Sequence, residues 1–263
     1  MSLPINQIIC GECSSVMSEW PDNTIDLIVT SPPYDNTRTY YGYEFDFEAI
    51  AQQLYRVTKD GGVVVWVVDD GSLANKSGKS GNSFKQALYF KEIGFNLHDT
   101  MIWNKNSFNS PGMGRYHNVF EYMFIFSKNR DPITFNPIND RKTLKQGTIK
   151  SRPPKRGSGK IREERIITIG EFGRRYNLWT ISVTAPLKTG HSATFPLQLV
   201  QDHIYSWSNE GDIVLDPFMG SGTTALAAIK LNRNYIGIEI SQEYCDLARE
   251  RISKLKEQIT IFD

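Results

Sequence analysis

Short apolar runs alternate with amphipathic stretches along most of this 263-residue chain. Runs rich in β-branched and aromatic residues predict strands over residues 7–10, 25–30, 63–68, 99–103, 119–126, 213–215 and 235–240. Apolar positions three or four residues apart predict helices over residues 47–57, 83–93, 197–207, 224–230 and 244–258, with a helical turn over 14–20. Strands that alternate with helices predict an α/β fold with a doubly wound, mainly parallel sheet.

Length and composition narrow the class of protein. A chain of 263 residues with 40% hydrophobic content can bury one substantial core, so we expect one α/β domain with an insertion. No window reaches about 18 consecutive apolar residues and no basic-then-apolar leader opens the chain, so we expect a soluble intracellular protein. The spacing of Cys10, Cys13 and Cys245 argues against a disulfide framework and a zinc site, and no metal is expected.

The first motif with chemical content is Ser31-Pro32-Pro33-Tyr34, which ends the predicted strand over residues 25–30. Prolines carry no N–H, so the Pro32 carbonyl and the Ser31 hydroxyl are available as acceptors for a planar NH2 group. The Tyr34 ring offers a face for stacking, worth about 1–3 kcal/mol per base in nucleic-acid sites. The motif therefore predicts a site for an amino-bearing base, and its alternative interpretation is a strand-ending turn with a buried tyrosine.

A second motif joins a predicted strand to a predicted helix and reads Asp216-Pro217-Phe218-Met219-Gly220-Ser221-Gly222-Thr223-Thr224. Its glycines allow the backbone to approach a ligand, and unpaired N–H groups at the start of the helix point into the turn. About twenty residues later the next predicted strand carries Glu239, placed to accept hydrogen bonds from ribose hydroxyls. Because ligands of open parallel sheets bind where strands end and the winding reverses, we expect the two motifs to share one pocket.

Together these motifs resemble the β group of S-adenosylmethionine-dependent DNA amino-methyltransferases, in which the catalytic motif precedes the cofactor motif. The resemblance covers nearly the whole chain and implies a Rossmann-like methyltransferase fold with permuted motif order. Further matches are Gly11-Glu12-Cys13, Trp103-Asn104-Lys105, the strand over 120–128 and His191-Ser192-Ala193-Thr194-Phe195-Pro196. The family usually has Gly-Asp in the first of these, so Glu12 departs from the pattern by one methylene.

The resemblance implies S-adenosylmethionine as cofactor and a set of residues that binds it. That set is Glu12, Cys13, Thr30, His191, Phe195, Pro196, Asp216, Pro217, Phe218, Gly220, Ser221, Gly222, Thr223, Thr224 and Glu239. The catalytic set is Ser31, Pro32, Pro33 and Tyr34, with direct transfer to a base that has left the duplex stack. Methylation of a ring carbon would call for a Pro-Cys pair, which the sequence lacks.

The target base is predicted from the first residue of the catalytic motif. Serine in this position is more frequent among N4-cytosine enzymes and aspartate is typical of N6-adenine enzymes, so Ser31 favours N4-cytosine with N6-adenine as the alternative. A protein glutamine methyltransferase usually has asparagine there and the opposite motif order. A non-catalytic DNA-binding module would not need the glycine turn, and a structural-RNA substrate stays open.

Basic charge is concentrated between the two motifs. Residues 141–175 hold twelve Lys and Arg against three Asp and Glu, a net +9, whereas the whole chain is +1 and the remainder therefore −8. This distribution predicts a phosphate-contacting segment at the family's target-recognition position, although a solvated basic linker would look similar. The candidate DNA-binding residues are Lys105, Arg141, Lys142, Lys145, Lys150, Arg152, Lys155, Arg156 and Lys160.

These assignments divide the chain into a catalytic half over residues 1–134, a target-recognition insertion over 135–185 and a cofactor-binding half over 186–263. The expected partner is double-stranded DNA, with a possible companion restriction endonuclease and either a monomer or a homodimer. The expected location is the cytoplasm of a prokaryote or phage host, in association with DNA.

Overall fold

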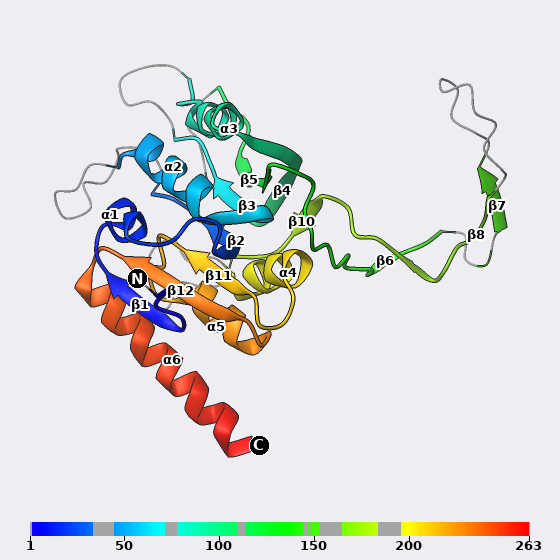
Figure 1. Ribbon diagram of the computed structural model, residues 1–263. Helices are drawn as coiled ribbons and strands as arrows, with labels where there is room; N and C mark the ends of the chain where they lie inside the picture. The colour runs from blue at the N-terminus through cyan, green and yellow to red at the C-terminus, as the bar shows by residue number, and fades with distance from the viewer. Residues whose placement is uncertain are drawn as a thin grey trace. The chain divides into compact units, whose positions relative to one another are not determined.

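The computed structural model describes residues 2–33, 45–71, 78–109, 114–144, 147, 149–152, 165–183 and 196–262, with backbone alone at 108–109, 149–152, 165–167 and 260–262 (Figure 1). These residues form two compact units. The main unit comprises Met1–Asn136 and Asn177–Asp263, and the second unit comprises Pro137–Tyr176.

The main unit is built on an eight-stranded sheet with the order β1-β12-β11-β2-β3-β5-β4-β10. Its strands are β1 (Gln7–Cys10), β2 (Ile25–Thr30), β3 (Thr58–Val68), β4 (Phe95–Asn109), β5 (Asn118–Lys128), β10 (Leu178–Thr180), β11 (Ile213–Asp216) and β12 (Asn234–Glu239). Among these described strands, only β5 is antiparallel to its neighbours; every other pair in the sheet is parallel. The predicted doubly wound, mainly parallel sheet is confirmed.

Helices cover both faces of this sheet (Figure 1). One face carries α1 (Cys13–Ser18), α2 (Phe47–Val57) and α3 (Asn82–Glu92), and the other carries α4 (Leu197–Trp207), α5 (Thr223–Lys230) and α6 (Gln242–Phe262). The core under α1–α3 is aromatic: Trp66 of β3 and Phe90 of α3 are fully buried, with ring centroids 5.1 Å apart in an edge-to-face arrangement.

The sheet reverses its winding between β2 and β11. From β2 the chain passes through α2 to β3 on one side, and from β11 it passes through α5 to β12 on the other side. Parallel strands on either side of such a reversal leave a crevice at their carboxyl ends, which is the standard ligand position in open α/β sheets. The carboxyl ends of β2 and β11 carry the two sequence motifs.

Several element boundaries differ from those predicted. Strand β3 begins at Thr58, because the chain leaves α2 without a loop and the Thr58 hydroxyl donates to the Leu54 carbonyl at 2.6 Å. Gly61 then lies inside the strand with φ +72°, and a Cβ there would come within 2.4 Å of Ile133, so the glycine pair is an irregularity of the strand and no helix exit. Asn82 and Ser83, predicted to end a polar loop, open α3.

The second unit consists of antiparallel strand pairs that the hydrophobic pattern did not predict. β6 (Arg141–Lys142) pairs with β9 (Phe172–Gly173), and β7 (Ile149–Arg152) pairs with β8 (Arg165–Thr168). These strands are mostly polar and lack the apolar alternation of a half-buried strand, which explains why periodicity missed them.

Candidate active site

The two motifs meet through a buried hydrogen bond. Thr30 ends β2 and is fully buried, and its hydroxyl donates to Oδ1 of Asp216, which ends β11, at 2.6 Å. Ser31 follows Thr30 directly, so the predicted catalytic motif begins one residue from this contact. Residues separated by 186 positions in sequence are thus neighbours at the winding reversal.

The Asp216 carboxylate is enclosed by donors. Besides Thr30, the Thr224 hydroxyl donates to Oδ2 at 2.6 Å and the Phe218 N–H donates to Oδ1 at 3.0 Å. Burial raises the pKa of Asp216 to about 6; the nearby Glu239 adds to this, and the hydrogen bonds from Thr224, Thr30 and Phe218 oppose it. The group therefore titrates closer to neutrality than an ordinary aspartate.

Glu239, at the end of β12, fixes the glycine turn from the opposite side. Its Oε2 accepts from the Gly220 N–H at 2.9 Å, and its Oε1 accepts from the Ser241 N–H at 2.9 Å. Each carboxylate oxygen retains further acceptor capacity, so Glu239 can brace the turn and still accept from ribose hydroxyls.

The start of α5 depends on Gly222. This residue has φ +88°, and a Cβ there would lie 2.9 Å from the Cβ of Ala248 in α6. No side chain caps the helix, so the N–H groups of its first turn, beginning at Thr223, can bind an anionic group.

The remaining residues of the cofactor motif are largely packed. Pro217 is buried, and the half-buried ring of Phe218 lies 5.8 Å from the Phe45 ring and 6.3 Å from the Trp66 ring. These contacts anchor the turn to the aromatic core under α1–α3.

Glu12 has a structural task in addition to its predicted one. Its carboxylate caps α1, accepting from the Ser14 N–H at 2.8 Å, the Ser15 N–H at 2.8 Å and the Ser14 hydroxyl at 2.7 Å. Partial burial opposes ionisation, but these bonds outweigh it and lower the pKa of Glu12 to about 2. Cys13 is buried beside it, and burial raises the pKa of the Cys13 thiol. Glu12 is therefore a fixed anion.

The catalytic motif is described in part. Pro32 is buried, while Ser31 and Pro33 are half-buried. Tyr34, His191 and Phe195 lie outside the described residues. Pro196 is buried and directly precedes α4, where its carbonyl accepts from the Leu199 N–H at 3.0 Å.

The predicted DNA-binding residues have different surroundings. The ammonium of Lys105 pairs with Glu121 at 3.1 Å, and the two side chains are 12% and 8% exposed, so this lysine is engaged within the main unit. Lys142 is exposed in β6, whereas Arg141 is half-buried. For Lys150 and Arg152 only the backbone, in β7, is described, and Lys145, Lys155, Arg156 and Lys160 lie outside the described residues.

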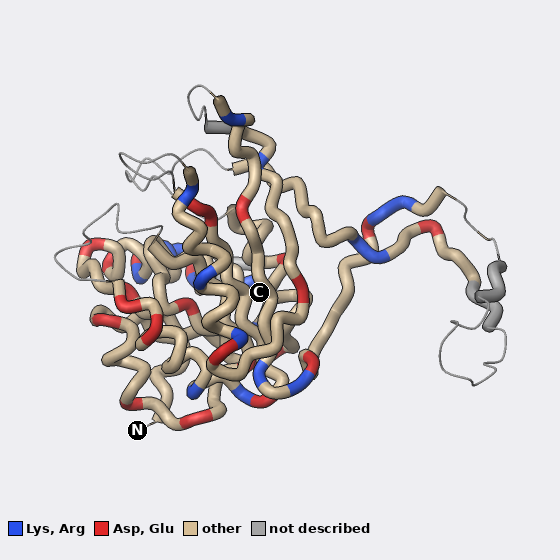
Figure 2. Tube along the Cα trace, turned by 90° about the horizontal axis from the view of Figure 1, so that it is seen from above, with Lys and Arg blue, Asp and Glu red and all other residues tan. Residues whose placement is uncertain are grey.

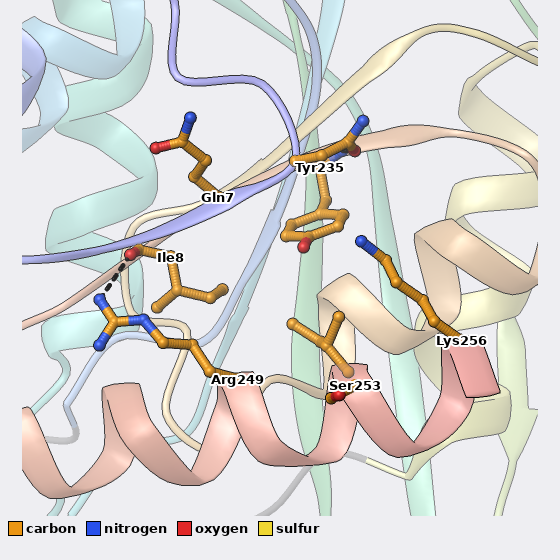
Figure 3. Close-up of a pocket in the computed structure, with 8 residues that line it drawn as sticks. Gln7, Ile8, Tyr235, Arg249, Ser253 and Lys256 are labelled. Carbon is orange, nitrogen blue, oxygen red and sulfur yellow. Dashed lines mark hydrogen bonds between the residues drawn. The ribbon is translucent and has the colours of Figure 1, made fainter.

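A hollow of about 450 Å³ lies between β1, β12 and α6 (Figure 3). Arg249 crosses its wall and donates to the Ile8 carbonyl at 2.9 Å. The hollow is lined by Asn6, Gln7 and Tyr235 from the amino-terminal ends of the two strands, opposite the edge that carries Asp216 and Glu239. It is separate from the candidate site.

Arg251 of α6 supports the site and was not predicted from the sequence. Its Nη1 donates to the Ser221 hydroxyl at 2.7 Å and also to the Ser221 carbonyl, which ties the glycine turn to the last helix. Burial lowers the pKa of Arg251. Nothing in the local sequence marks this arginine among its charged neighbours; only the packing of α6 beside the turn reveals it.

Fold and site together define the class of protein: a Rossmann-like methyltransferase that uses S-adenosylmethionine. A carboxylate at the end of β12, the glycine turn after β11 and an uncapped helix start match the ribose hydroxyls and the carboxylate of that cofactor in donor and acceptor chemistry. The family model described as DNA methylase matches residues 25–250. The chain belongs to this family and is an S-adenosylmethionine-dependent DNA amino-methyltransferase.

Named relatives are in keeping with this assignment. The chain is 55% identical over 240 residues to the orphan methyltransferase M.BamHII of Bacillus amyloliquefaciens, covering 88% of this chain and 89% of that protein. The crystal structure of TTHA0409 from Thermus thermophilus, a DNA modification methylase complexed with S-adenosylmethionine, is similar with a TM-score of 0.67 and 25% identity, covering 95% and 94% of the two chains. The cytosine-N4-specific PvuII DNA methyltransferase shares the fold, with a TM-score of 0.69 at 20% identity over 96% and 91% of the chains. In the part of the chain that the structure describes, no helix is long and apolar enough to cross a membrane.

Proposed function

We propose that the protein transfers the methyl group of S-adenosylmethionine to the exocyclic N4 of cytosine in duplex DNA, at a specific sequence. Ser31, at the first position of the catalytic motif, supports cytosine, and N6-adenine is the alternative because both bases present the same NH2 group. The name of the relative at 55% identity calls that protein an orphan methyltransferase; a companion endonuclease for this chain stays a prediction.

Bound S-adenosylmethionine supplies an electrophilic methyl group on a positively charged sulfur. On this chain, Glu239 would accept from the ribose hydroxyls and the start of α5 would face the cofactor carboxylate. Asp216 would hold the turn between them through its bonds to Thr30 and Thr224. Glu12, already ionised, retains acceptor capacity for an adenine amino group.

The amine nitrogen of cytosine is a poor nucleophile because its lone pair is delocalised into the ring. Accepting its protons at the Ser31 hydroxyl and the Pro32 carbonyl favours a tetrahedral nitrogen, and this interaction strengthens as the new bond forms. Tyr34 would stack on the flipped base and hold it in place. Positioning of the two reactants supplies much of the remaining acceleration.

The observation that carries this proposal is the bond between Thr30 and Asp216. It fixes the strand end that leads into Ser31 against the strand end that leads into the glycine turn, so an amine held by one motif would face a methyl donor held by the other.

The test is incubation of unmethylated plasmid DNA with the protein and S-adenosylmethionine, followed by digestion and mass spectrometry of the nucleosides. We expect N4-methylcytosine, its loss in Ser31→Ala, and its retention in the control Ser253→Ala, an exposed serine of α6 on the other edge of the sheet. Formation of N6-methyladenine alone would replace cytosine by the alternative base. Absence of any methylated base would contradict the proposal as a whole.

A further inference from the structure

The second unit is a single two-stranded ribbon. Between the β6–β9 and β7–β8 pairs the ladder continues, because the Thr143 N–H donates to the Glu171 carbonyl at 2.9 Å and the Gly147 N–H donates to the Ile169 carbonyl at 2.8 Å. At the base, the Arg175 N–H donates to the Ile138 carbonyl at 2.8 Å. The described backbone is therefore cross-linked from Ile138 and Arg175 to Arg152 and Arg165.

This ribbon lacks a hydrophobic core of its own among its described residues. Leu144 is 101% exposed, Phe172 52% and Tyr176 65%, and no described side chain of the unit belongs to the buried core. Isolated two-stranded ribbons are marginally stable in water. Exposed apolar side chains on such a ribbon indicate a surface that a partner covers.

The charge of the ribbon selects the chemistry of that partner. Residues 141–175 carry a net +9, and both described strands of the unit have basic positions (Figure 2). Such a concentration in an otherwise acidic chain fits a polyanion.

The basic residues near the base of the ribbon divide into two kinds. Arg141 donates to the Arg174 carbonyl at 3.0 Å and its guanidinium lies 4.6 Å from the centre of the Tyr176 ring, and Arg175 Nε donates to Asp140 at 2.8 Å. These two arginines brace the ribbon. Lys142 is exposed and is the cross-strand partner of Phe172, so the two residues share one face.

We propose that this ribbon enters the major groove of duplex DNA, with Lys142 on the phosphates and the apolar side chains of Leu144 and Phe172 against base edges. The inference rests on the proposed function and adds how the target is read. The major groove is about 12 Å wide and admits a two-stranded β-ribbon, whereas the minor groove, at about 6 Å, does not. Apolar side chains there can contact thymine methyl groups.

The first experiment separates Lys142 from a general charge effect. Binding of a long mixed-sequence duplex to the full-length protein with saturating S-adenosylmethionine is measured by fluorescence anisotropy across a salt series. Lys142→Ala should lower the slope of log affinity against log salt by about 1 and weaken binding about tenfold near 0.1 M salt. The matched control is Lys230→Ala, an exposed lysine that ends α5 at the opposite sheet edge, and it should not change the slope. Identical slopes for the two variants would overturn the inference.

The second experiment identifies the groove. Methylation of plasmid DNA by the wild-type protein is measured with methyl green, which occupies the major groove, or with netropsin, which occupies the minor groove. We expect inhibition by methyl green and little effect of netropsin; the reverse result overturns the groove assignment while leaving the methyltransferase function intact. Absence of methylation without either dye would instead contradict the proposed function.

The third experiment tests the apolar residues. Phe172→Ser and Leu144→Ser should change which plasmid sites are methylated, read by single-molecule sequencing, by tenfold or more in the ratio of preferred to disfavoured sites. Sedimentation velocity is run in parallel. A variant that changes the oligomeric state but leaves the site pattern unaltered would show that these side chains face a second copy of the chain, and would overturn the DNA assignment.

Discussion

At the scale of single residues, Asp216 links stability to pH. Its pKa of about 6 in the folded protein exceeds the ordinary value of 3.8, so between about pH 4 and pH 6 the folded state holds a proton that the unfolded state has lost. The free energy of unfolding therefore falls as pH rises through this window, and the full penalty is present above it. A shift of this size corresponds to about 3 kcal/mol.

Asp216→Asn should remove that dependence. The amide keeps the shape of the side chain and does not ionise, so the variant should lose the decline between pH 4 and pH 6 and be at least as stable as wild type at pH 7.5. Urea denaturation at pH 4.5 and 7.5 measures this. The control is Asp131→Asn, whose side chain is 97% exposed and which should follow wild type. A wild-type slope in Asp216→Asn would show that another group causes it.

Two alanine variants test the division of roles between the motifs. Ser31→Ala and Asp216→Ala should both abolish methylation, but only Asp216→Ala should weaken S-adenosylmethionine binding, because Ser31 is proposed to hold the base and Asp216 the cofactor turn. Isothermal titration calorimetry gives the cofactor affinity, with an expected loss of tenfold or more for Asp216→Ala. An equal loss in both variants would refute this division.

How far the sequence predicts the site also depends on particular residues. Thr30, Asp216 and Glu239 were predicted from strand ends and motif spacing, and the structure brings them to one edge of the sheet. The capping bonds of Glu12 and the burial of Lys105 against Glu121 could not be predicted, because they depend on partners that only tertiary packing supplies.

At the scale of elements, α6 supports the glycine turn through Arg251. Hydrogen bonds from a charged donor contribute about 1.5–3 kcal/mol, so Arg251→Ala should lower the free energy of unfolding by that amount and weaken cofactor binding. Arg251→Lys keeps the charge and one donor and should be affected less. Urea denaturation with and without S-adenosylmethionine gives both effects; loss of stability without any change in cofactor affinity would show that Arg251 does not position the turn.

Element prediction succeeded where apolar periodicity was strong. The helices α2 and α4 and the strand β2 have the boundaries expected from the sequence, because each buries one apolar face or run. The β6–β9 and β7–β8 pairs were not predicted, since strands without a buried face leave no periodic signal.

At the scale of the whole molecule, cofactor chemistry and the ribbon belong to different units. A ligand that binds only the folded state stabilises it by about 2.7 kcal/mol at one hundred times its Kd. S-adenosylmethionine should therefore raise the Tm of wild type and of Lys142→Ala equally, while Lys142→Ala still weakens DNA binding. Differential scanning calorimetry checks this, and a reduced shift in Lys142→Ala would mean that the ribbon takes part in cofactor binding.

The most direct test of the central claim is a crystal structure of the protein with bound S-adenosylmethionine, in which the distance from the methyl carbon to Ser31 Oγ is measured. An amine placed between them needs about 3 Å on each side, so the account predicts a separation of about 6 Å across open space. A methyl group much farther away, or separated from Ser31 by protein atoms, would contradict the account.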